Sequence, residues 1–299
     1  MKILLFGKGG QLGWELQRSL APLGELVALD FDSTELCGDF TNPSGLAETV
    51  RTVRPDVIVN AAAHTAVDKA QSEPELVRTI NALAPAVLAQ QAATLGAWLV
   101  HYSTDYVFDG SGERPWREQD ATGPLNIYGQ TKLEGEQAIA LSAAKHLVFR
   151  TSWVYAARGS NFAKTMLRLA KERERMSVIN DQVGAPTGAE LLADVTAHAL
   201  RQVTASADGA SLGGLYHLSA SGQTTWHGYA SFVLETALNL GVALKASPAT
   251  IDPVTTAAFP TAAQRPLNSR LDTTKLRRTF NLVLPPWQQG VVRMLTETL

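Results

Sequence analysis

A tyrosine and a lysine four residues apart, Tyr128 and Lys132 in the stretch YGQTK, are residue types that can protonate a carbonyl oxygen. Residues four apart lie on the same face of an α-helix. A nearby ammonium group favours the phenolate, which makes the phenol a better acid near neutral pH. Upstream, Thr104 in HYSTDYVF has a hydroxyl that could hold the same oxygen. Most Tyr–Lys pairs at this spacing are solvated surface residues, so the elements that position the pair decide its meaning.

Short apolar runs alternate with longer amphipathic runs in the first half of the chain, which predicts a parallel sheet with helices on its faces. Runs such as DVIVNAA are nearly all apolar, as is typical of strands that are buried on both sides. Thr104 then ends the fourth strand, where open α/β sheets bind ligands. The expected strands are residues 2–6, 25–30, 56–62, 98–104 and 146–152, and the expected helices are 11–20, 44–55, 74–95 and 128–143.

The second half has a different pattern, with helical stretches joined by segments rich in Gly, Ser, Thr and Pro. Its expected helices are residues 161–174, 190–203, 226–240 and 287–298. Residues 204–214 read as a flexible surface loop. We therefore expect a Rossmann-like doubly wound α/β domain at residues 1–150 and a smaller, mixed α/β substrate domain at residues 151–299. This boundary allows segments after residue 150 to pack again on the first domain.

A glycine-rich turn, GKGGQLG, lies between the first expected strand and the first expected helix. Gly7, Gly10 and Gly13 have the spacing G-x-x-G-x-x-G. Glycine allows positive φ and close approach of backbone to a pyrophosphate, and the helix N-terminus presents free N–H groups to it. This context predicts a bound dinucleotide.

Two acidic residues bear on the choice of dinucleotide. Asp30 ends the second expected strand, where a carboxylate holds the ribose hydroxyls of NAD and repels a 2′-phosphate. Lys8 in the glycine-rich turn offsets that repulsion, so NADH and NADPH both stay open. Asp39 either bonds the adenine or is an ordinary loop acid.

The segments together resemble a known family. The glycine-rich start, NAAA (60–63), STDYVF (103–108) and YGQTK (128–132) resemble the extended short-chain dehydrogenase/reductases. More narrowly, the chain resembles the dTDP-4-dehydrorhamnose reductases from residue 3 to the C-terminal helix. The segments that carry this resemblance are AVDKA (66–70), STDYVFDG (103–110), YGQTKLEGE (128–136), RTSWVY (150–155), DQVGAPT (181–187) and RPLNSRLD (265–272).

The resemblance implies reduction of the C4 keto group of dTDP-4-dehydro-L-rhamnose to dTDP-L-rhamnose, with NADPH or NADH as cofactor. It implies Thr104, Tyr128 and Lys132 as the catalytic group, with Ser103 as the alternative to Thr104. Asn81 either supports the lysine through water or is a helix-surface amide. The implied cofactor contacts are Gly7, Gly10, Gln11, Leu12, Gly13, Asp30, Asp39, Phe40, Ala61, Ala62, Ala63, Tyr128 and Lys132.

Five further residues are expected to bind the nucleotide-sugar together with Thr104. Trp153 and Asp105 would contact the sugar, although Trp153 could instead be a core residue at a domain junction. Gln182, Arg265 and Asn268 lie in polar segments of the second half. An arginine suits a pyrophosphate because its planar fork donates two parallel hydrogen bonds, so we assign Arg265 there.

A magnesium ion and a homodimer are also implied by the resemblance. Glu190 and Asp194 are four apart and share one helix face, and Glu15 would join them if the two helices adjoin. Such carboxylates are usually only a solvated face. A hard cation with oxygen ligands at a dimer interface is the alternative.

Composition excludes several classes of function. The net charge of −2 gives no footprint for nucleic acid, and the single cysteine, Cys37, rules out an intrachain disulfide and fits a reducing cytoplasm. We find no signal peptide and no apolar run near the roughly 20 residues of a membrane span. The six histidines lack zinc spacing, and His64 and His101 are expected to be packed or hydrogen-bonded.

Two rival functions stay open on the same fold. A nucleotide-sugar epimerase or dehydratase would keep NAD tightly bound, and a dehydratase would place an acid pair beside Thr104. STDYVF has one aspartate and no adjacent glutamate. A non-catalytic regulatory subunit would have a broken catalytic group, whereas this one is intact.

Overall fold

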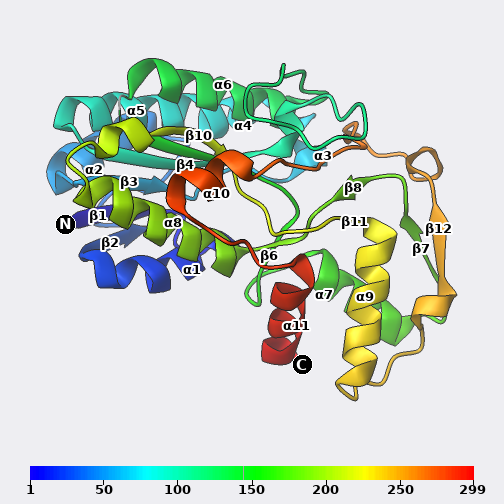
Figure 1. Cartoon of the computed structure of the whole chain (residues 1–299). Helices are drawn as coiled ribbons and strands as arrows, with labels where there is room; N and C mark the ends of the chain where they lie inside the picture. Colours follow the sequence, from blue (N-terminus) through cyan, green and yellow to red (C-terminus); the bar gives the residue numbers. More distant parts are fainter. Residues whose placement is uncertain (144) are drawn as a thin grey trace.

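The computed structural model describes residues 1–143 and 145–299, and a six-stranded parallel sheet lies at its centre (Figure 1). The strand order is β10-β5-β4-β3-β1-β2, and all neighbouring pairs are parallel. This confirms the predicted doubly wound α/β fold. The order reverses between β1 and β3, so a ligand crevice forms at their carboxyl ends. The strands are β1 (Lys2–Phe6), β2 (Glu25–Leu29), β3 (Val57–Asn60), β4 (Trp98–Thr104), β5 (His146–Thr151) and β10 (Gly214–His217).

Helices cover both faces of the sheet, which explains the nearly all-apolar strands (Figure 1). In β1, Ile3 and Leu5 pack on one face, and Leu4 and Phe6 pack on the other, all fully buried. The first face is covered by α1 (Gln11–Leu20), α8 (Ala189–Ala205) and α10 (Thr274–Phe280). The second is covered by α2 (Pro43–Val53), α5 (Ala84–Leu95) and α6 (Ile127–Ser142).

The stretch expected as one helix over residues 74–95 is interrupted by a π-turn. The pieces are α4 (Pro74–Arg78), the π-turn η2 (Thr79–Leu83) and α5. Pro85 has no N–H to donate to the carbonyl of Asn81, so the α-helical ladder cannot pass through this turn. A Cβ on Gly135 of α6 would lie 2.3 Å from the Asn81 carbonyl oxygen, so glycine there allows α6 to approach closely.

The second half builds a smaller unit around three helices and three short strand pairs. Its core contains Tyr155, Tyr229 and Trp287. The helices are α7 (Phe162–Glu172), α9 (Trp226–Asn239) and α11 (Trp287–Thr298). The strand pairs are β6 (Val154–Tyr155) with β9 (Thr187–Gly188), β7 (Met176–Ile179) with β12 (Ile251–Val254), and β8 (Val183–Gly184) with β11 (Thr224–Thr225).

The stretch expected as a surface loop at residues 204–214 is exposed over residues 204–208, but regular structure occupies more of it than expected. α8 continues to Ala205, a 3₁₀ turn forms at Gly209–Leu212, and β10 begins at Gly214. A Cβ on Gly209 would lie 1.8 Å from the Val203 carbonyl oxygen, so this segment is tightly folded against the end of α8. α8 and β10 thus bring the second half of the chain back to the central sheet. Within the described residues, none of the helices has the length and apolar character needed to span a membrane.

Candidate active site

The glycine-rich turn forms a backbone cradle at the carboxyl ends of β1 and β3. Gly7 has φ +84°, and a Cβ there would lie 2.8 Å from the backbone of Ala61 and Ala62. The N–H of Gly10 donates to the Gly7 carbonyl at 3.2 Å and turns the chain into α1. Gly10 caps α1 without a side-chain hydrogen bond, so the first N–H groups of the helix are left for an anionic ligand. The cradle fits a dinucleotide pyrophosphate.

Gly13→Ala is expected to lower dinucleotide affinity at least about tenfold, because the new Cβ would lie 1.8 Å from the Gly7 carbonyl oxygen and displace the turn. Calorimetric titration with NADPH measures this affinity. Gly123→Ala is the matched control, since its Cβ would meet Asp109 at an ordinary 3.4 Å. Wild-type affinity in a folded Gly13→Ala protein would remove the turn from the cofactor site.

The acidic loop residues beside the cradle are engaged locally. The Asp30 carboxylate accepts hydrogen bonds from the N–H groups of Gly9 at 2.8 Å and Phe31 at 3.0 Å. Asp39 accepts from the N–H and hydroxyl of Thr41, both at 2.8 Å. Phe40 is a core residue packed on β1, so its ring is not available to a cofactor.

A cavity of about 450 Å³ lies beside the cradle, at the carboxyl ends of β3, β4 and β5. It brings together more than half of the residues expected to bind cofactor and substrate. The expected cofactor residues that do not line it are Gly7, Gly13, Asp30, Asp39, Phe40 and Ala62. The expected residues that line it are Gly10, Gln11, Leu12, Ala61, Ala63, Thr104, Asp105, Tyr128, Lys132 and Trp153.

Tyr128 and Thr104 meet in this cavity from different elements. Tyr128 lies in the first turn of α6, whose N-cap Asn126 accepts from the Gly129 N–H at 2.9 Å. Burial raises the pKa of Tyr128 to about 12, and hydrogen bonding to Thr104 partly opposes this. The expected bias toward phenolate is therefore not found in the free protein, because burial outweighs it. The phenol is protonated at neutral pH and can donate.

Lys132, one turn further along α6, is almost completely buried. Its Nζ donates to the Tyr102 carbonyl at 2.6 Å and lies 3.2 Å from Nε2 of His101. Burial lowers the pKa of Lys132 to about 8, and the carboxylate of Glu136 acts in the opposite direction. Lys132 therefore releases its proton at a lower pH than an ordinary lysine does.

Three buried side chains that line the cavity have polar atoms without a partner among the described residues. They are Oγ of Ser103, Oδ2 of Asp105 and Oγ1 of Thr151. The other oxygen of Asp105 accepts from the Thr104 hydroxyl at 3.2 Å. Leaving such atoms unbonded is costly, so they fit the hydroxyl groups of a bound sugar.

Asp105→Asn is expected to gain stability relative to wild type as the pH rises. Burial raises the pKa of Asp105 to about 7, whereas an unfolded aspartate titrates near about 4. The folded wild type therefore binds the extra proton between these values, and it loses stability as the pH climbs through them. Asparagine cannot ionise, so the difference in Tm should grow between about pH 4 and about pH 7, from the unfolded to the folded pKa of the aspartate. A constant difference over that range would contradict it.

Trp153 closes the cavity in a strained backbone conformation. Its φ is +49°, a left-handed value that is uncommon for a bulky residue. The indole stacks on Trp226 of α9 at 3.7 Å between ring centroids. Such strain persists only where the surroundings fix it and concentrates at functional sites. Trp153 thus belongs both to the cavity wall and to the core of the second unit.

A second cavity of about 580 Å³ adjoins the first, and Tyr106 and Trp226 line both. Its walls combine apolar side chains of α7 and β7 with three arginines. The arginines are Arg173, Arg175 and Arg265. Gln182 also lines it and is buried, accepting from Trp226 Nε1 at 3.0 Å. Apolar walls with clustered cations suit a nucleoside diphosphate.

The arginine predicted for pyrophosphate is already paired. The guanidinium of Arg265 donates to both oxygens of Asp68 at 2.6 and 3.1 Å, which lowers the pKa of that carboxyl. A diphosphate would share or displace this pair. Sequence analysis missed Arg173 and Arg175, because charges at the end of a helix and in the turn after it usually face solvent. Only the fold turns them toward this cavity.

The side-chain amides of Asn268 and Asn81, both considered as site residues from the sequence, are hydrogen-bonded to the backbone. Asn268 lies outside both cavities, and its amide donates to the carbonyls of Ser111 and Arg114 at 3.3 and 2.9 Å. A substrate contact of Asn268 does not follow from this geometry, since the amide fixes a loop. Asn81 is buried in the π-turn and exchanges hydrogen bonds with the backbone of His64 at 2.9 and 3.1 Å. It is therefore not a helix-surface amide.

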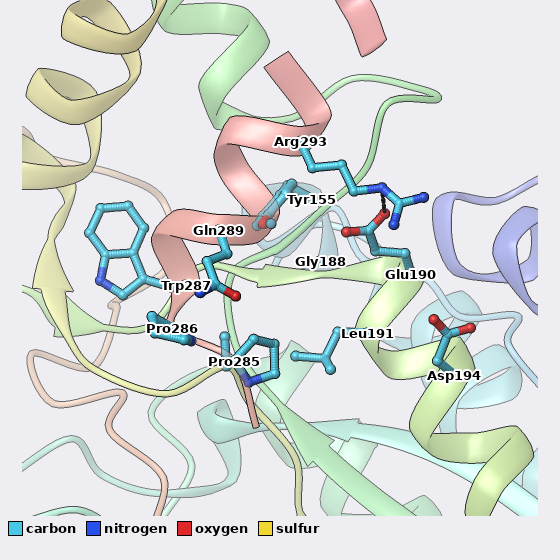
Figure 2. Close-up of a pocket in the computed structure, with 12 residues that line it drawn as sticks. Tyr155, Gly188, Glu190, Leu191, Asp194, Pro285, Pro286, Trp287, Gln289 and Arg293 are labelled. Atoms are coloured by element: carbon cyan, nitrogen blue, oxygen red, sulfur yellow. Dashed lines mark ion pairs between the residues drawn. The ribbon is translucent and has the colours of Figure 1, made fainter. Parts of the chain in front are cut away.

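Two of the three expected metal ligands, Glu190 and Asp194, line a small pocket between α8 and α11 (Figure 2). Arg18 pairs with Glu15 at 3.3 Å and with Asp194 at 2.9 Å, and Arg293 pairs with Glu190 at 3.2 Å. No group of three or more His, Cys, Asp or Glu side chains in the described part of the chain could hold a metal ion. The two arginines already neutralise the carboxylates, so these residues do not fit a magnesium site within one chain.

A Rossmann sheet whose crevice holds a tyrosine and a lysine on one helix defines an oxidoreductase of the extended short-chain dehydrogenase/reductase class. The family model described as "RmlD substrate binding domain" matches residues 1–299. The chain is 63% identical over 297 residues to the dTDP-4-dehydrorhamnose reductase of Escherichia coli K12, covering 99% of this chain and 98% of that one. The chain belongs to the dTDP-4-dehydrorhamnose reductase family.

Solved structures agree with this assignment. A dTDP-4-dehydrorhamnose reductase from Bacillus anthracis in complex with NADP is 36% identical, with a TM-score of 0.89 and 99% of each chain covered. A Thermus thermophilus UDP-glucose 4-epimerase in complex with NAD is 19% identical, with a TM-score of 0.77 and full coverage of both chains. The second likeness shows the fold alone.

Proposed function

We propose that the protein reduces the C4 keto group of dTDP-4-dehydro-L-rhamnose with a hydride from NAD(P)H and forms dTDP-L-rhamnose for polysaccharide biosynthesis. The observation that carries this is the meeting of Thr104, Tyr128 and Lys132 between the glycine cradle and the arginine-lined cavity. Curated relatives with this name match the chain over its full length. When bound, the reduced nicotinamide supplies the hydride.

The catalytic roles follow from the positions of three side chains. The Thr104 hydroxyl holds the C4 oxygen beside Tyr128. Tyr128, which burial keeps protonated, gives its proton to that oxygen. Lys132 reaches the nicotinamide ribose hydroxyls with the N–H groups that the Tyr102 carbonyl leaves free. Ser103 lines the same cavity, but the hydroxyl that is hydrogen-bonded to Tyr128 is that of Thr104, so we favour Thr104.

The sugar and its nucleotide would occupy the two adjoining cavities. Asp105 and Thr151 accept or donate to sugar hydroxyls, and Trp153 walls the sugar ring. Arg173 and Arg265 meet the diphosphate, and the apolar wall of the second cavity covers the base. Gln182 holds Trp226 in place at the junction.

Use of both NADH and NADPH is part of the proposal. The Asp30 carboxylate that would repel a 2′-phosphate is bonded to two backbone N–H groups, which spreads its charge. The Bacillus anthracis relative was solved with NADP. Comparing kcat/KM for the two nucleotides decides the preference.

The test is oxidation of NADH or NADPH by purified protein, followed by nicotinamide absorbance with dTDP-4-dehydro-L-rhamnose made in situ from its 4-keto precursor. We expect oxidation that requires the sugar. No oxidation together with NAD retained through purification would favour an epimerase or dehydratase. No oxidation and no retained nucleotide would favour a regulatory subunit.

Magnesium and the homodimer stay predictions of the resemblance, and a cytoplasmic location stays a prediction of the composition. Because Arg18 and Arg293 already pair with the acidic residues, we expect chelation with EDTA to leave the reduction rate unchanged. Sedimentation before and after chelation reports the oligomeric state. A rate that falls with EDTA and returns with Mg²⁺ would contradict the expectation and place a cation at an interface between copies.

A further inference from the structure

A row of buried polar side chains behind the cavity joins β3, β4 and α6. Asn60 ends β3 and lies beside His101 in the register of β4. Nδ2 of Asn60 is 3.0 Å from Nδ1 of His101, and Nε2 of His101 is 3.2 Å from Nζ of Lys132. All three residues are at most 2% exposed. The proposed reduction assigns no role to Asn60 or His101.

The backbone decides which way the Asn60 amide faces. Oδ1 of Asn60 lies 3.0 Å from the N–H of Ala62, and a backbone N–H can only donate. The amide nitrogen, which also only donates, therefore faces His101. Nδ1 of His101 must accept and carries no proton. Burial lowers the pKa of His101 well below its usual value, so the ring is neutral and its proton is on Nε2.

This tautomer limits the state of Lys132. The N–H at Nε2 of His101 points at Nζ of Lys132, and an ammonium group has donors only. A charged Lys132 would place two donors against each other. A neutral amine accepts from His101 and still donates to the Tyr102 carbonyl at 2.6 Å. Every hydrogen bond in the row is satisfied only with the neutral amine.

We propose that Asn60 and His101 are positioning residues that favour the neutral amine of Lys132 over its ammonium form in the free protein, so that the lysine takes up a proton when an anionic ligand reaches it. The inference rests on the proposed function only in taking Lys132 as an active-site residue. It explains how the protein keeps a lysine buried without an uncompensated charge before the dinucleotide arrives.

The charged groups on the surrounding elements do not disturb the hydrogen bonds between Asn60, His101 and Lys132. Glu136 of α6 favours the charged form of Lys132, but its carboxylate is bound by Arg150 of β5 at 2.6 Å. Tyr128 is uncharged, and Asp105 gains its charge only near pH 7, according to its pKa of about 7. The strand β3 and the π-turn η2 contain no titratable side chain.

Asn60→Asp reverses the direction of the hydrogen bonds along the row, and an aspartate side chain has almost the same shape as an asparagine. One carboxylate oxygen still accepts from Ala62, and the other now accepts from His101, whose proton moves to Nδ1. Nε2 then accepts from a charged Lys132. Competitive acetylation with acetic anhydride measures how reactive each lysine is, and mass spectrometry of the peptides identifies the lysine. Repeated over a range of pH, it gives the midpoint at which Lys132 becomes reactive. The exposed Lys69 is the internal reference. We expect the midpoint to rise by at least one unit, a tenfold loss of neutral amine at a given pH.

The tautomer is measured directly by ¹⁵N NMR of histidine-labelled protein, with the His101 signal assigned from a His101→Gln sample. We expect the proton on Nε2 in the wild type and on Nδ1 in Asn60→Asp. Asn81→Asp is the matched control, because Asn81 is as buried as Asn60 and contacts Thr131 rather than His101. It should leave the tautomer unchanged and shift the Lys132 midpoint less.

A proton on Nδ1 of His101 in the wild type would overturn the proposal, even if Asn60→Asp failed to fold. Equal midpoint shifts in Asn60→Asp and Asn81→Asp would also overturn it, since added charge alone would then account for the change. Neither measurement needs substrate turnover. A failure of the proposed reduction is therefore distinguishable from a failure of this inference.

Discussion

Tyr128→Phe is expected to lower kcat by about 100- to 10,000-fold, while the Kd for NADPH changes by less than about twofold. The substitution removes the proton donor and leaves the ring. Tyr128 packs edge-on against Tyr106 with 5.7 Å between centroids, so the variant keeps this contact and the shape of the cavity. Steady-state kinetics with saturating sugar measure kcat, and calorimetry measures cofactor binding.

Tyr216→Phe is a matched control for that variant. Tyr216 lies on β10, and its hydroxyl donates to the Leu212 carbonyl at 2.6 Å in the core, away from both cavities. Loss of that hydrogen bond should leave kcat nearly unchanged. Turnover of Tyr128→Phe close to that of Tyr216→Phe would remove Tyr128 from the chemistry.

Arg150→Met is expected to lower the free energy of unfolding by about 3–5 kcal/mol, because it leaves a carboxylate buried without its partner. Arg150 and Glu136 form three hydrogen bonds of 2.6–3.2 Å, and their side chains are 4% and 7% exposed. Arg150 also lies over the ring of Phe108 at 4.9 Å. Urea denaturation, followed by fluorescence, gives the difference between the two proteins.

Arg168→Met removes a pair of the same chemistry on the surface, where Arg168 and Glu172 are 62% and 55% exposed. It should cost less than about 1 kcal/mol. Arg150→Met combined with Glu136→Leu should regain part of the loss, since no charge is then left in the core. A single Arg150→Met protein as stable as Arg168→Met would show that the buried pair contributes nothing.

The first half of the fold follows from local patterns in the chain. KILLF and WLVHYST become β1 and β4 over the expected residues, because a strand buried on both faces must be nearly all apolar. Helix ends follow from local chemistry too. Asn42 caps α2 ahead of Pro43, and Arg54 takes a left-handed conformation just before Pro55 ends the helix.

Other features depend on contacts between distant segments and could not be predicted. β10 is a four-residue strand after a Gly- and Ser-rich stretch, and only its pairing with β5 distinguishes it from a loop. The cavity of Thr104, Tyr128 and Lys132 was expected from the family pattern, while Arg173 needed the placement of α7 against β7. His101 was expected to be packed or hydrogen-bonded, but its link to Asn60 required the sheet register.

The return of β10 to the sheet has a consequence for how the chain folds as it is made. β5 is complete at Thr151, yet its outer edge stays unpaired until His217 has been synthesised. The helices α8 and α10, which cover the apolar face beneath it, come equally late. A nascent chain released early therefore exposes an open strand edge, a template for aggregation. For this reason a fragment ending near residue 150 should be recovered mainly from inclusion bodies, and the cofactor half cannot be exchanged between proteins as a unit.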